Sequence, residues 1–258
     1  MQNEPPTTDD IFSRQILLRE IGRDGQMVLF QSRVAIVGAG AVGGAIAELL
    51  ARAGVGTITI IDHDIVVFSN LPRQTLFTWQ DAECKLFKAE AARRHLNEIM
   101  PTCRVFPIVE SLAPDNVGSI LRGADIVADG TDNIETRFVI NDWCVTNGIP
   151  WVYAGAAGTR TSVYPVLGKN RCLRCLFPDT PSAEALPTCR EIGVLGSAAT
   201  LAASLSSTLV LRILLNDTPE SEFLTADVWT QEFSRISIEK MRLANGNRPC
   251  PLCDSIKK

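Results

Sequence analysis

The chain has 258 residues, of which 46% are hydrophobic and 21% charged, and its net charge at pH 7 is −4. This length and composition suffice for one sizeable α/β core. The acidic balance excludes a sequence-independent nucleic-acid binder, because such proteins need a basic face to displace phosphate counterions. We therefore expect small-molecule or protein partners and no nucleic acid.

The first part of the chain predicts a small helical segment ahead of the main fold. Between residues 9 and 29 apolar side chains recur on one helical face: Ile11, Ile16, Leu17 and Ile21. The N-terminus carries neither the basic stretch nor the apolar stretch of a secretion signal. We therefore expect a cytoplasmic protein.

A glycine-rich turn follows. Gly38, Gly40 and Gly43 stand between an apolar run at 34–37 and a helical stretch at 43–53, and Asp62 follows the next predicted strand, 57–61. Glycines allow the backbone to approach a phosphate, the helix start offers unpaired N–H groups, and a carboxylate about 20 residues on can accept from ribose hydroxyls. The pattern predicts a nucleotide-binding βαβ unit. The alternative is an ordinary tight turn.

The elements then alternate between helix and strand, which predicts a Rossmann-like, doubly wound, mostly parallel α/β sheet. They are helix 81–98, strand 104–109, helix 114–121, strand 124–129, helix 134–147 and strand 150–154. Strands 161–166, 222–229 and 232–238 are expected to form an antiparallel extension. We predict a single domain over 1–258, comprising N-terminal helices (1–30), a nucleotide-binding core (31–155) and a C-terminal part (156–258) with a mobile loop at 176–188.

The segment Ile192–Leu211 contains no charged residue and is long enough to cross a bilayer. It is rich in Gly, Ala, Ser and Thr rather than Leu and Phe. This composition favours a helix buried in a core or a subunit interface, so we expect no membrane contact.

Polar residues after the second and fourth predicted strands are suited to a nucleoside triphosphate. Its concentrated charge calls for cations, so Arg73 and Lys88 are candidate phosphate ligands, with the alternative that each is a solvated surface cation. Asp64, Asn70, Gln74 and Asn133 are further candidate contacts. Asp132 lies where the carboxyl ends of the strands meet and is a candidate Mg²⁺ ligand, or else the N-cap of helix 134–147.

Two Cys-x-x-Cys pairs, Cys172 with Cys175 and Cys250 with Cys253, provide four thiolates, the ligand set of a closed structural zinc site. The pairs lie farther apart than in one zinc ribbon, so disulfides or a redox pair are alternatives, although an acidic chain without a leader favours metal. Cys189 lies beside the Pro-rich loop and a predicted helix start, where the local field favours a thiolate. It is a candidate nucleophile, or else simply a small residue at the helix start.

Taken together, these motifs resemble the E1-like adenylyltransferases of the ThiF/MoeB/HesA type. The resemblance rests on Arg14-Gln15, the turn 38–43, Asp62, the segment 69–74, Lys88 and the segment 131–133. It implies ATP-dependent adenylation of the C-terminal glycine of a ubiquitin-like (β-grasp) sulfur carrier ending in Gly-Gly, with release of pyrophosphate. Gly44, where a serine is frequent in the family, and Cys84, where a glycine is frequent, depart from the pattern, but neither removes a charge that the implied mechanism needs.

The resemblance also implies roles, cofactors and partners. Asp62 would hold the ribose; Asn70, Arg73 and Lys88 the phosphates; Asp132 a Mg²⁺ ion. Arg14 resembles an arginine that reaches ATP from the partner subunit of a homodimer. The implied cofactors are ATP, Mg²⁺ and Zn²⁺, and a sulfurtransferase or cysteine desulfurase is an implied partner. Family members differ in whether the cysteine that matches Cys189 forms a covalent adduct.

Three alternatives remain on sequence grounds. The same adenylating fold could act on a peptide or another small carboxylate. The glycine pattern also occurs in NAD-dependent oxidoreductases, but that function would leave Arg14, Arg73, Lys88 and Asp132 without a joint purpose. A non-catalytic nucleotide-binding scaffold is the third.

Overall fold

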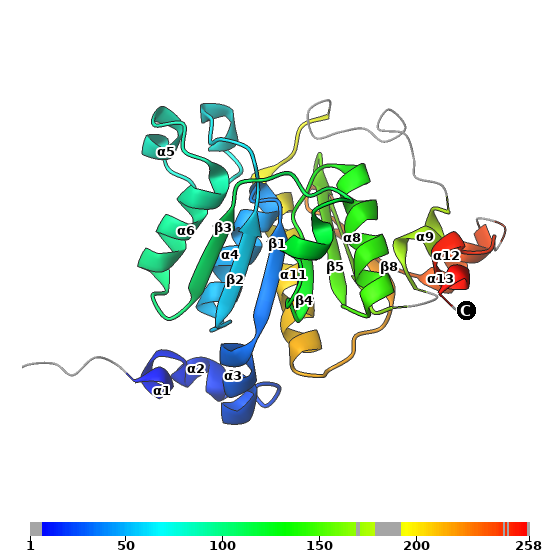
Figure 1. The fold of residues 1–258 in the computed structure, drawn as a ribbon, viewed down its shortest axis with the longest axis horizontal. Helices are drawn as coiled ribbons and strands as arrows, with labels where there is room; N and C mark the ends of the chain where they lie inside the picture. Colours follow the sequence, from blue (N-terminus) through cyan, green and yellow to red (C-terminus); the bar gives the residue numbers. More distant parts are fainter. Residues whose placement is uncertain (1–6, 169–170, 179–191, 245, 247, 257–258) are drawn as a thin grey trace, which may run out of the picture.

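The computed structural model describes residues 7–168, 171–178, 192–244, 246 and 248–256. Its centre is an eight-stranded sheet in the order β3-β2-β1-β4-β5-β6-β7-β8 (Figure 1). The strands are β1 (Arg33–Val37), β2 (Thr57–Ile61), β3 (Arg104–Ile108), β4 (Ile126–Asp129), β5 (Trp151–Ala157), β6 (Arg160–Val166), β7 (Glu222–Asp227) and β8 (Glu232–Ser237). Strands β1 to β5 pair in parallel, and β5 to β8 pair antiparallel. The predicted doubly wound sheet with an antiparallel extension is confirmed.

Helices cover both faces of the parallel part. The helical elements are α1 (Thr8–Ile11), α2 (Ser13–Ile16), α3 (Gly22–Gln31), α4 (Ala41–Arg52), η1 (Phe68–Asn70), α5 (Trp79–Glu83), α6 (Lys88–Ile99), α7 (Val117–Ile120), α8 (Ile134–Asn147), α9 (Leu173–Leu176), α11 (Gly196–Leu214), α12 (Ile238–Ala244) and α13 (Pro251–Ser255). Val34 and Ile36 of β1 belong to the core beneath α4 and α11, and Ala35 and Val37 belong to the core beneath α8. This burial on both faces explains why β1 is a continuous apolar run.

Helix α11 is long and apolar enough to cross a membrane by length and composition. In the structure it packs along α4 and across β5 and β6. Its small residues Ala199, Ala202 and Ala203 belong to the same buried core as the α4 residues and allow the two helices to approach closely. This is the packing of a core helix, the interpretation that its small-residue composition favoured.

The prediction of one helix over 81–98 is wrong, because α5 ends at Glu83 and α6 begins at Lys88. Lys85 has a left-handed φ of +50°, and the N–H of Leu86 folds back onto the carbonyl of Asp81. The carbonyl of Leu86 in turn accepts from Val66, so the connecting segment joins the loop after β2. These tertiary hydrogen bonds override the helical pattern and make Lys88 the first residue of a new helix.

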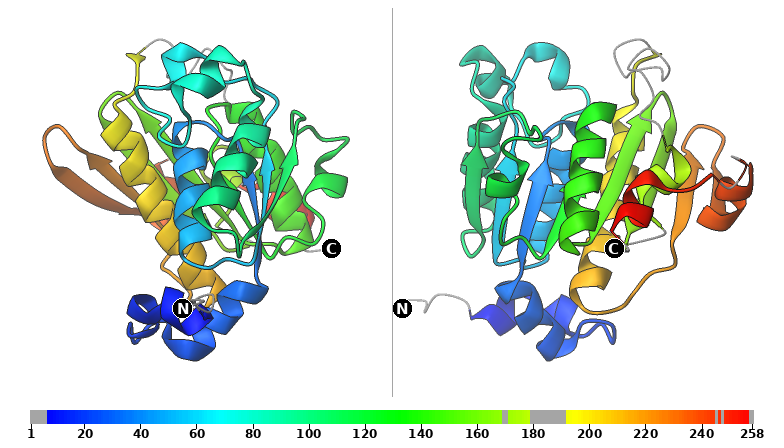
Figure 2. Two further views of the ribbon diagram at one scale, coloured as in Figure 1. Left: turned by 90° about the vertical axis from the view of Figure 1, so that its left-hand side faces the viewer. Right: turned by 45° about the vertical axis from the view of Figure 1, so that its right-hand side comes forward.

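The strands' two ends carry different structures. Helices α1, α2 and α3 lie at the amino ends of the parallel strands, whereas the turn after β1, the segment α5 and the start of α8 lie at the carboxyl ends (Figure 1). The β7–β8 hairpin projects from the far edge of the sheet (Figure 2). Ligands of open α/β folds bind at the carboxyl ends, so this is where the site is sought.

Candidate functional site

The turn between β1 and α4 needs two of its three predicted glycines for its own backbone. Gly38 has a φ of +88°, which side chains disfavour, and its N–H donates to the carbonyl of Ile61 at 2.7 Å. A Cβ on Gly43 would lie 1.8 Å from the carbonyl oxygen of Gly38. A Cβ on Gly40 would meet nothing closer than Gln74 Nε2 at 3.8 Å. The space beside Gly40 is thus left open at the start of α4, where N–H groups favour an anion.

Gly130, which the sequence analysis missed, interlocks with this turn. A Cβ there would lie 2.4 Å from Gly43 Cα and 2.7 Å from the oxygen of Gly38. The loop after β4 therefore packs backbone to backbone on the glycine turn. The only sequence signal was a glycine directly after a buried strand, which marks a close backbone approach.

We expect alanine at position 43 and alanine at position 40 to separate folding from binding. Gly43→Ala forces the added Cβ into the carbonyl oxygen of Gly38, so the backbone has to shift, and the midpoint of thermal unfolding should fall by several degrees, since backbone strain costs about 1–3 kcal/mol. Gly40→Ala should keep the unfolding midpoint of the wild type, and only its affinity for ATP should fall. Thermal unfolding and ATP titration of both variants check this, and equal unfolding midpoints would contradict it.

Asp62 directly follows β2 and is hydrogen-bonded to the glycine turn. Its side chain is largely buried, and its carboxylate accepts from the N–H of Ala39 at 2.7 Å and of Asp64 at 2.8 Å. Burial raises the pKa of Asp62, while Lys88 and the two N–H groups oppose this shift. A buried carboxylate at the end of the second strand is the position from which a ribose is held in such folds.

Lys88 is not a solvated surface cation, so that alternative is wrong. The break before α6 turns it inward, where only 7% of the residue is exposed. Its ammonium donates to Asp64 Oδ2 at 2.7 Å, and its backbone N–H donates to the Asp64 carbonyl at 2.8 Å. The side chain of Asp64 is 51% exposed, so this pair puts a desolvated cation within reach of a ligand at the carboxyl ends of the strands.

The segment around η1 contributes an amide and a guanidinium. Asn70 is buried and its Oδ1 accepts from the N–H of Val67 at 3.1 Å. Arg73 is half-buried, and its Nη1 donates to the carbonyl of Ser69 at 2.6 Å. Asn70 thus shapes the loop, and Arg73 keeps further donors for an anion.

Gln74 is buried, and its Oε1 has no hydrogen-bond partner among the described residues. Buried side-chain oxygens without a partner are rare, and each one calls for an explanation. The other end of this amide, the donor Nε2, lies nearest the open space beside Gly40, so it can donate a hydrogen bond to an anion held at the glycine turn. The residues present therefore fit a nucleotide.

The loop that follows β4 holds Asp132 and Asn133. The Oδ1 of Asn133 accepts from the N–H of Thr136 at 3.0 Å and caps α8, so the interpretation of Asp132 as the N-cap is wrong. Asp132 is exposed and forms no hydrogen bond or ion pair with any residue that the structure describes. Its carboxylate can therefore serve as a ligand for Mg²⁺, which is usually held by one or two carboxylates and substrate phosphates.

Two predicted residues are not part of this assembly. Arg14 lies on α2, at the amino ends of the strands and opposite the glycine turn (Figure 1). It cannot reach this site within its own chain. Cys189 and most of the predicted loop 176–188 fall outside the described residues.

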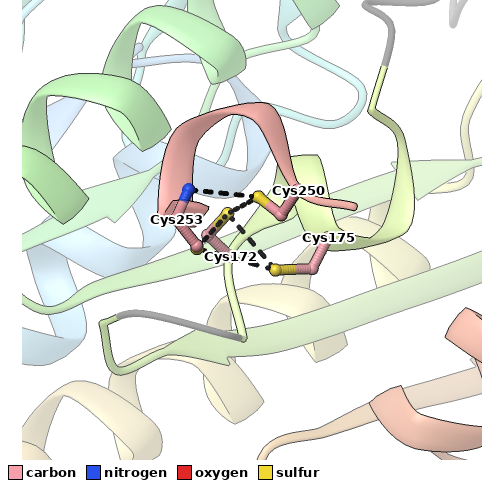
Figure 3. A group of neighbouring side chains, drawn as sticks. All are labelled: Cys172, Cys175, Cys250 and Cys253. Atoms are coloured by element: carbon pink, nitrogen blue, oxygen red, sulfur yellow. Dashed lines mark hydrogen bonds between the residues drawn. The ribbon is translucent and has the colours of Figure 1, made fainter. Parts of the chain in front are cut away.

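The four predicted metal-binding cysteines converge at the other side of the molecule. Cys172 and Cys175 begin and line α9, Cys250 and Cys253 do the same for α13, and all four are buried (Figure 3). Their sulfurs lie 3.5 to 3.7 Å apart along the contacting edges. A tetrahedral zinc with bonds of about 2.3 Å has S···S edges of about 3.8 Å, whereas a disulfide bond is about 2.05 Å. The cluster fits a zinc site, and the disulfide alternative is wrong.

Without a cation the cluster resists ionisation. Hydrogen bonds with the thiols of Cys175 and Cys253, together with burial, raise the pKa of Cys172 above its ordinary value. Four neighbouring thiolates thus require a positive ion between them. Because all four positions are taken by protein, such a site is structural.

Comparison with known proteins places these features in a family. The model of the ThiF family matches residues 12–252. The "Sulfur carrier protein ThiS adenylyltransferase" of Bacillus subtilis is 36% identical over 94% of this chain and 70% of its own length. The "SAMP-activating enzyme E1" of Haloferax volcanii is 32% identical over 95% of this chain and 88% of its own.

Two further similarities bear on extent and fold. The "Adenylyltransferase and sulfurtransferase MOCS3" of Sus scrofa is 37% identical, but this chain spans only 53% of its length. The crystal structure of E. coli MccB superposes with a TM-score of 0.78 at 22% identity, covering 96% of this chain and 73% of that one, which shows the shared fold. Since the family model spans nearly the whole chain and relatives above 30% identity agree with it, the chain belongs to the ThiF family of E1-like adenylyltransferases.

Proposed function

We propose that the protein uses ATP to adenylate the C-terminal carboxylate of a ubiquitin-like sulfur carrier. One observation carries the proposal: the loop that interlocks with the glycine turn at Gly130 leads directly to the unpaired carboxylate of Asp132, and Asp62, which accepts from Ala39 of that turn, lies near the buried ammonium of Lys88. The names of relatives that activate ThiS and SAMP support the choice of substrate class.

The reaction forms a bond between a carboxylate oxygen of the carrier and the α-phosphorus of ATP, and it breaks the bond to the β-phosphate, which leaves as pyrophosphate. Negative charge grows on the non-bridging oxygens, and fixed cations stabilise it without rearrangement. Arg73 and Lys88 would neutralise the phosphates, and Asp62 would hold the ribose. Asp132 would hold Mg²⁺, which neutralises the pyrophosphate that leaves.

A homodimer is part of the proposal, because Arg14 can act only on the site of a second copy. Exposed apolar side chains on and around α2 and α3 support an interface at that end: Leu17, Leu18, Met27 and Val28. The sulfur would come from a separate sulfurtransferase or cysteine desulfurase, and we place the protein in the cytoplasm. The four-cysteine cluster would hold Zn²⁺.

The edge of the sheet offers a place for the carrier. Strand β8 pairs with β7 alone among the described strands, so its outer edge has unpaired N–H and C=O groups. Trp229 and Phe233 are 76% and 62% exposed on this hairpin. A β-grasp protein can extend such an edge with a strand of its own.

Replacing Phe233 with aspartate is therefore expected to raise the KM for the carrier about tenfold and leave ATP affinity unchanged, because losing an aromatic contact costs about 1–2 kcal/mol. The matched control is Phe106→Asp on β3, the opposite edge of the sheet, where the phenylalanine is 53% exposed. Steady-state kinetics with varied carrier measures both. Equal effects at the two edges would contradict docking at β8.

The proposed function is tested by ATP–pyrophosphate exchange with and without a β-grasp protein ending in Gly-Gly. Exchange that depends on the carrier supports it. Exchange with a peptide or a small carboxylate instead would redirect the same chemistry to another substrate, and thermal stabilisation by NAD but not by ATP would refute it.

A further inference from the structure

Arg137 lies inside the molecule, on the first turns of α8, and the sequence analysis gave it no role. Its guanidinium is surrounded by partners from three segments. Nε donates to Asp129 Oδ2 at 2.8 Å, and Nη2 donates to the carbonyls of Thr131 at 2.7 Å and Ala154 at 3.0 Å. Nη1 donates to the hydroxyl of Tyr153 at 3.3 Å, and the guanidinium also packs over that ring.

The Asp129–Arg137 pair fixes every polar group of Thr131. The carboxylate of Asp129 accepts from the N–H of Thr131 at 2.8 Å and from its hydroxyl at 2.9 Å, while Arg137 takes its carbonyl. Asp129 is fully buried, and the side chain of Arg137 is only 12% exposed. Removing one partner of such a pair leaves an uncompensated buried charge, so the pair holds its geometry firmly.

Asp132 is the next residue, and hydrogen bonds fix the residue on each side of it. Thr131 precedes it with all its polar groups occupied, and Asn133 follows it and caps α8. Arg137 is near enough that the charge of Asp132 acts on it. Burial alone would lower the pKa of Arg137, but Asp129 and Tyr153 outweigh burial and raise it, so the guanidinium stays charged.

We infer that Arg137 is a positioning residue for the metal ligand Asp132. Four of the five N–H groups of the guanidinium are directed at Asp129, Thr131, Tyr153 and Ala154, so the side chain is held by the fold rather than offered to substrate. Instead, Arg137 fixes the loop after β4 and so determines the position of the Asp132 carboxylate. The same loop interlocks with the glycine turn at Gly130. A ligand fixed before binding spares the cost of ordering it when Mg²⁺ and ATP arrive.

Arg137→Lys is the decisive variant. Lysine keeps the charge beside Asp129 but cannot reach Asp129, Thr131 and Ala154 together, because its donors sit on one atom. We expect ATP binding, measured calorimetrically at graded Mg²⁺ concentrations and without a carrier, to need at least about tenfold more Mg²⁺ for half-maximal affinity. ATP binding measured with EDTA in place of Mg²⁺ should be unchanged.

Tyr153→Phe is the matched control. It removes the 3.3 Å hydrogen bond to Arg137 and keeps the ring beneath the guanidinium, so the Mg²⁺ requirement should stay as in the wild type. If Arg137→Lys only lowers the unfolding temperature and leaves the Mg²⁺ requirement unchanged, the residue is merely structural and the inference is wrong. Should Arg137→Lys fail to fold, Thr131→Val, which removes the hydrogen bonds of the hydroxyl to Asp129 and to the carbonyl of Asn133, gives the same test with a smaller expected shift.

The inference rests on the proposed function only for the identity of the metal and nucleotide. The binding assay contains no carrier, so its result does not depend on adenylation. A wild type that binds Mg²⁺ and ATP but exchanges pyrophosphate with no carrier would refute the proposed function and leave the role of Arg137 testable.

Discussion

Asp132→Ala is expected to reduce carrier-dependent ATP–pyrophosphate exchange by roughly 10²- to 10³-fold, the loss typical of removing one electrostatic stabiliser of a transition state. The structure gives the reason: the carboxylate is exposed, follows directly on the loop that packs against the glycine turn, and has no hydrogen bond or ion pair among the described residues. Removing it therefore breaks no hydrogen bond or ion pair among the described residues. The unfolding temperature should stay within about 2 °C of the wild type.

The matched control for this variant is Glu135→Ala. Glu135 is exposed in the first turn of α8, so the substitution removes the same charge from the same end of the same helix. Exchange should stay within about fivefold of the wild type, because a charge near a helix terminus is worth only about 0.3–1 kcal/mol. Equal losses in the two variants would assign the effect to the local field rather than to a metal ligand, and full activity of Asp132→Ala would remove this residue from the mechanism.

The parts of the site that the sequence predicted are those set by local backbone geometry. Gly38, Gly43 and Asp62 belong to one βαβ unit, so their spacing along the chain already determines how they meet. The cysteine pairs were also predicted from the sequence, because each pair spans one turn and four thiols in an acidic chain favour a metal site.

The other features of the site depend on contacts between segments far apart in the sequence, so the sequence did not predict them. Gly130 meets Gly43 only because β4 lies beside β1 in the sheet, a neighbour relation that the sequence does not state. The buried environment of Lys88 depends on hydrogen bonds between the segment before α6 and the loop after β2, which break a pattern that reads as one helix. Arg137 looked like one more arginine on a helix, and its four partners come from β4, β5 and the loop between β4 and α8.

Loss of the four-cysteine cluster is expected to have the largest effect on stability. In Cys250→Ser the zinc content should fall from one ion per chain to less than about 0.1, and the unfolding free energy should fall by at least about 3 kcal/mol, a drop of about 6–12 °C in the unfolding temperature. Cys84→Ser is the control, because Cys84 is exposed and lies outside the cluster. Metal analysis and thermal unfolding of both variants measure the difference.

The contacts around the cluster indicate which parts of the structure the loss of zinc should affect. The N–H of Leu173 donates to Asn141 Oδ1 at 2.7 Å, and Arg174 forms two hydrogen bonds with Asp142, at 2.6 and 2.7 Å. These bonds join the cysteine turn to the second half of α8, whereas Asp132 precedes its first turn. The glycine interlock and the Asp129–Arg137 pair involve no residue of the cluster, so ATP binding by zinc-free protein should persist below its lowered unfolding temperature. Loss of ATP binding in a variant that is still folded would show instead that α8 transmits the state of the cluster to the site. An unfolding temperature that a chelator leaves unchanged would show that the fold does not depend on the metal.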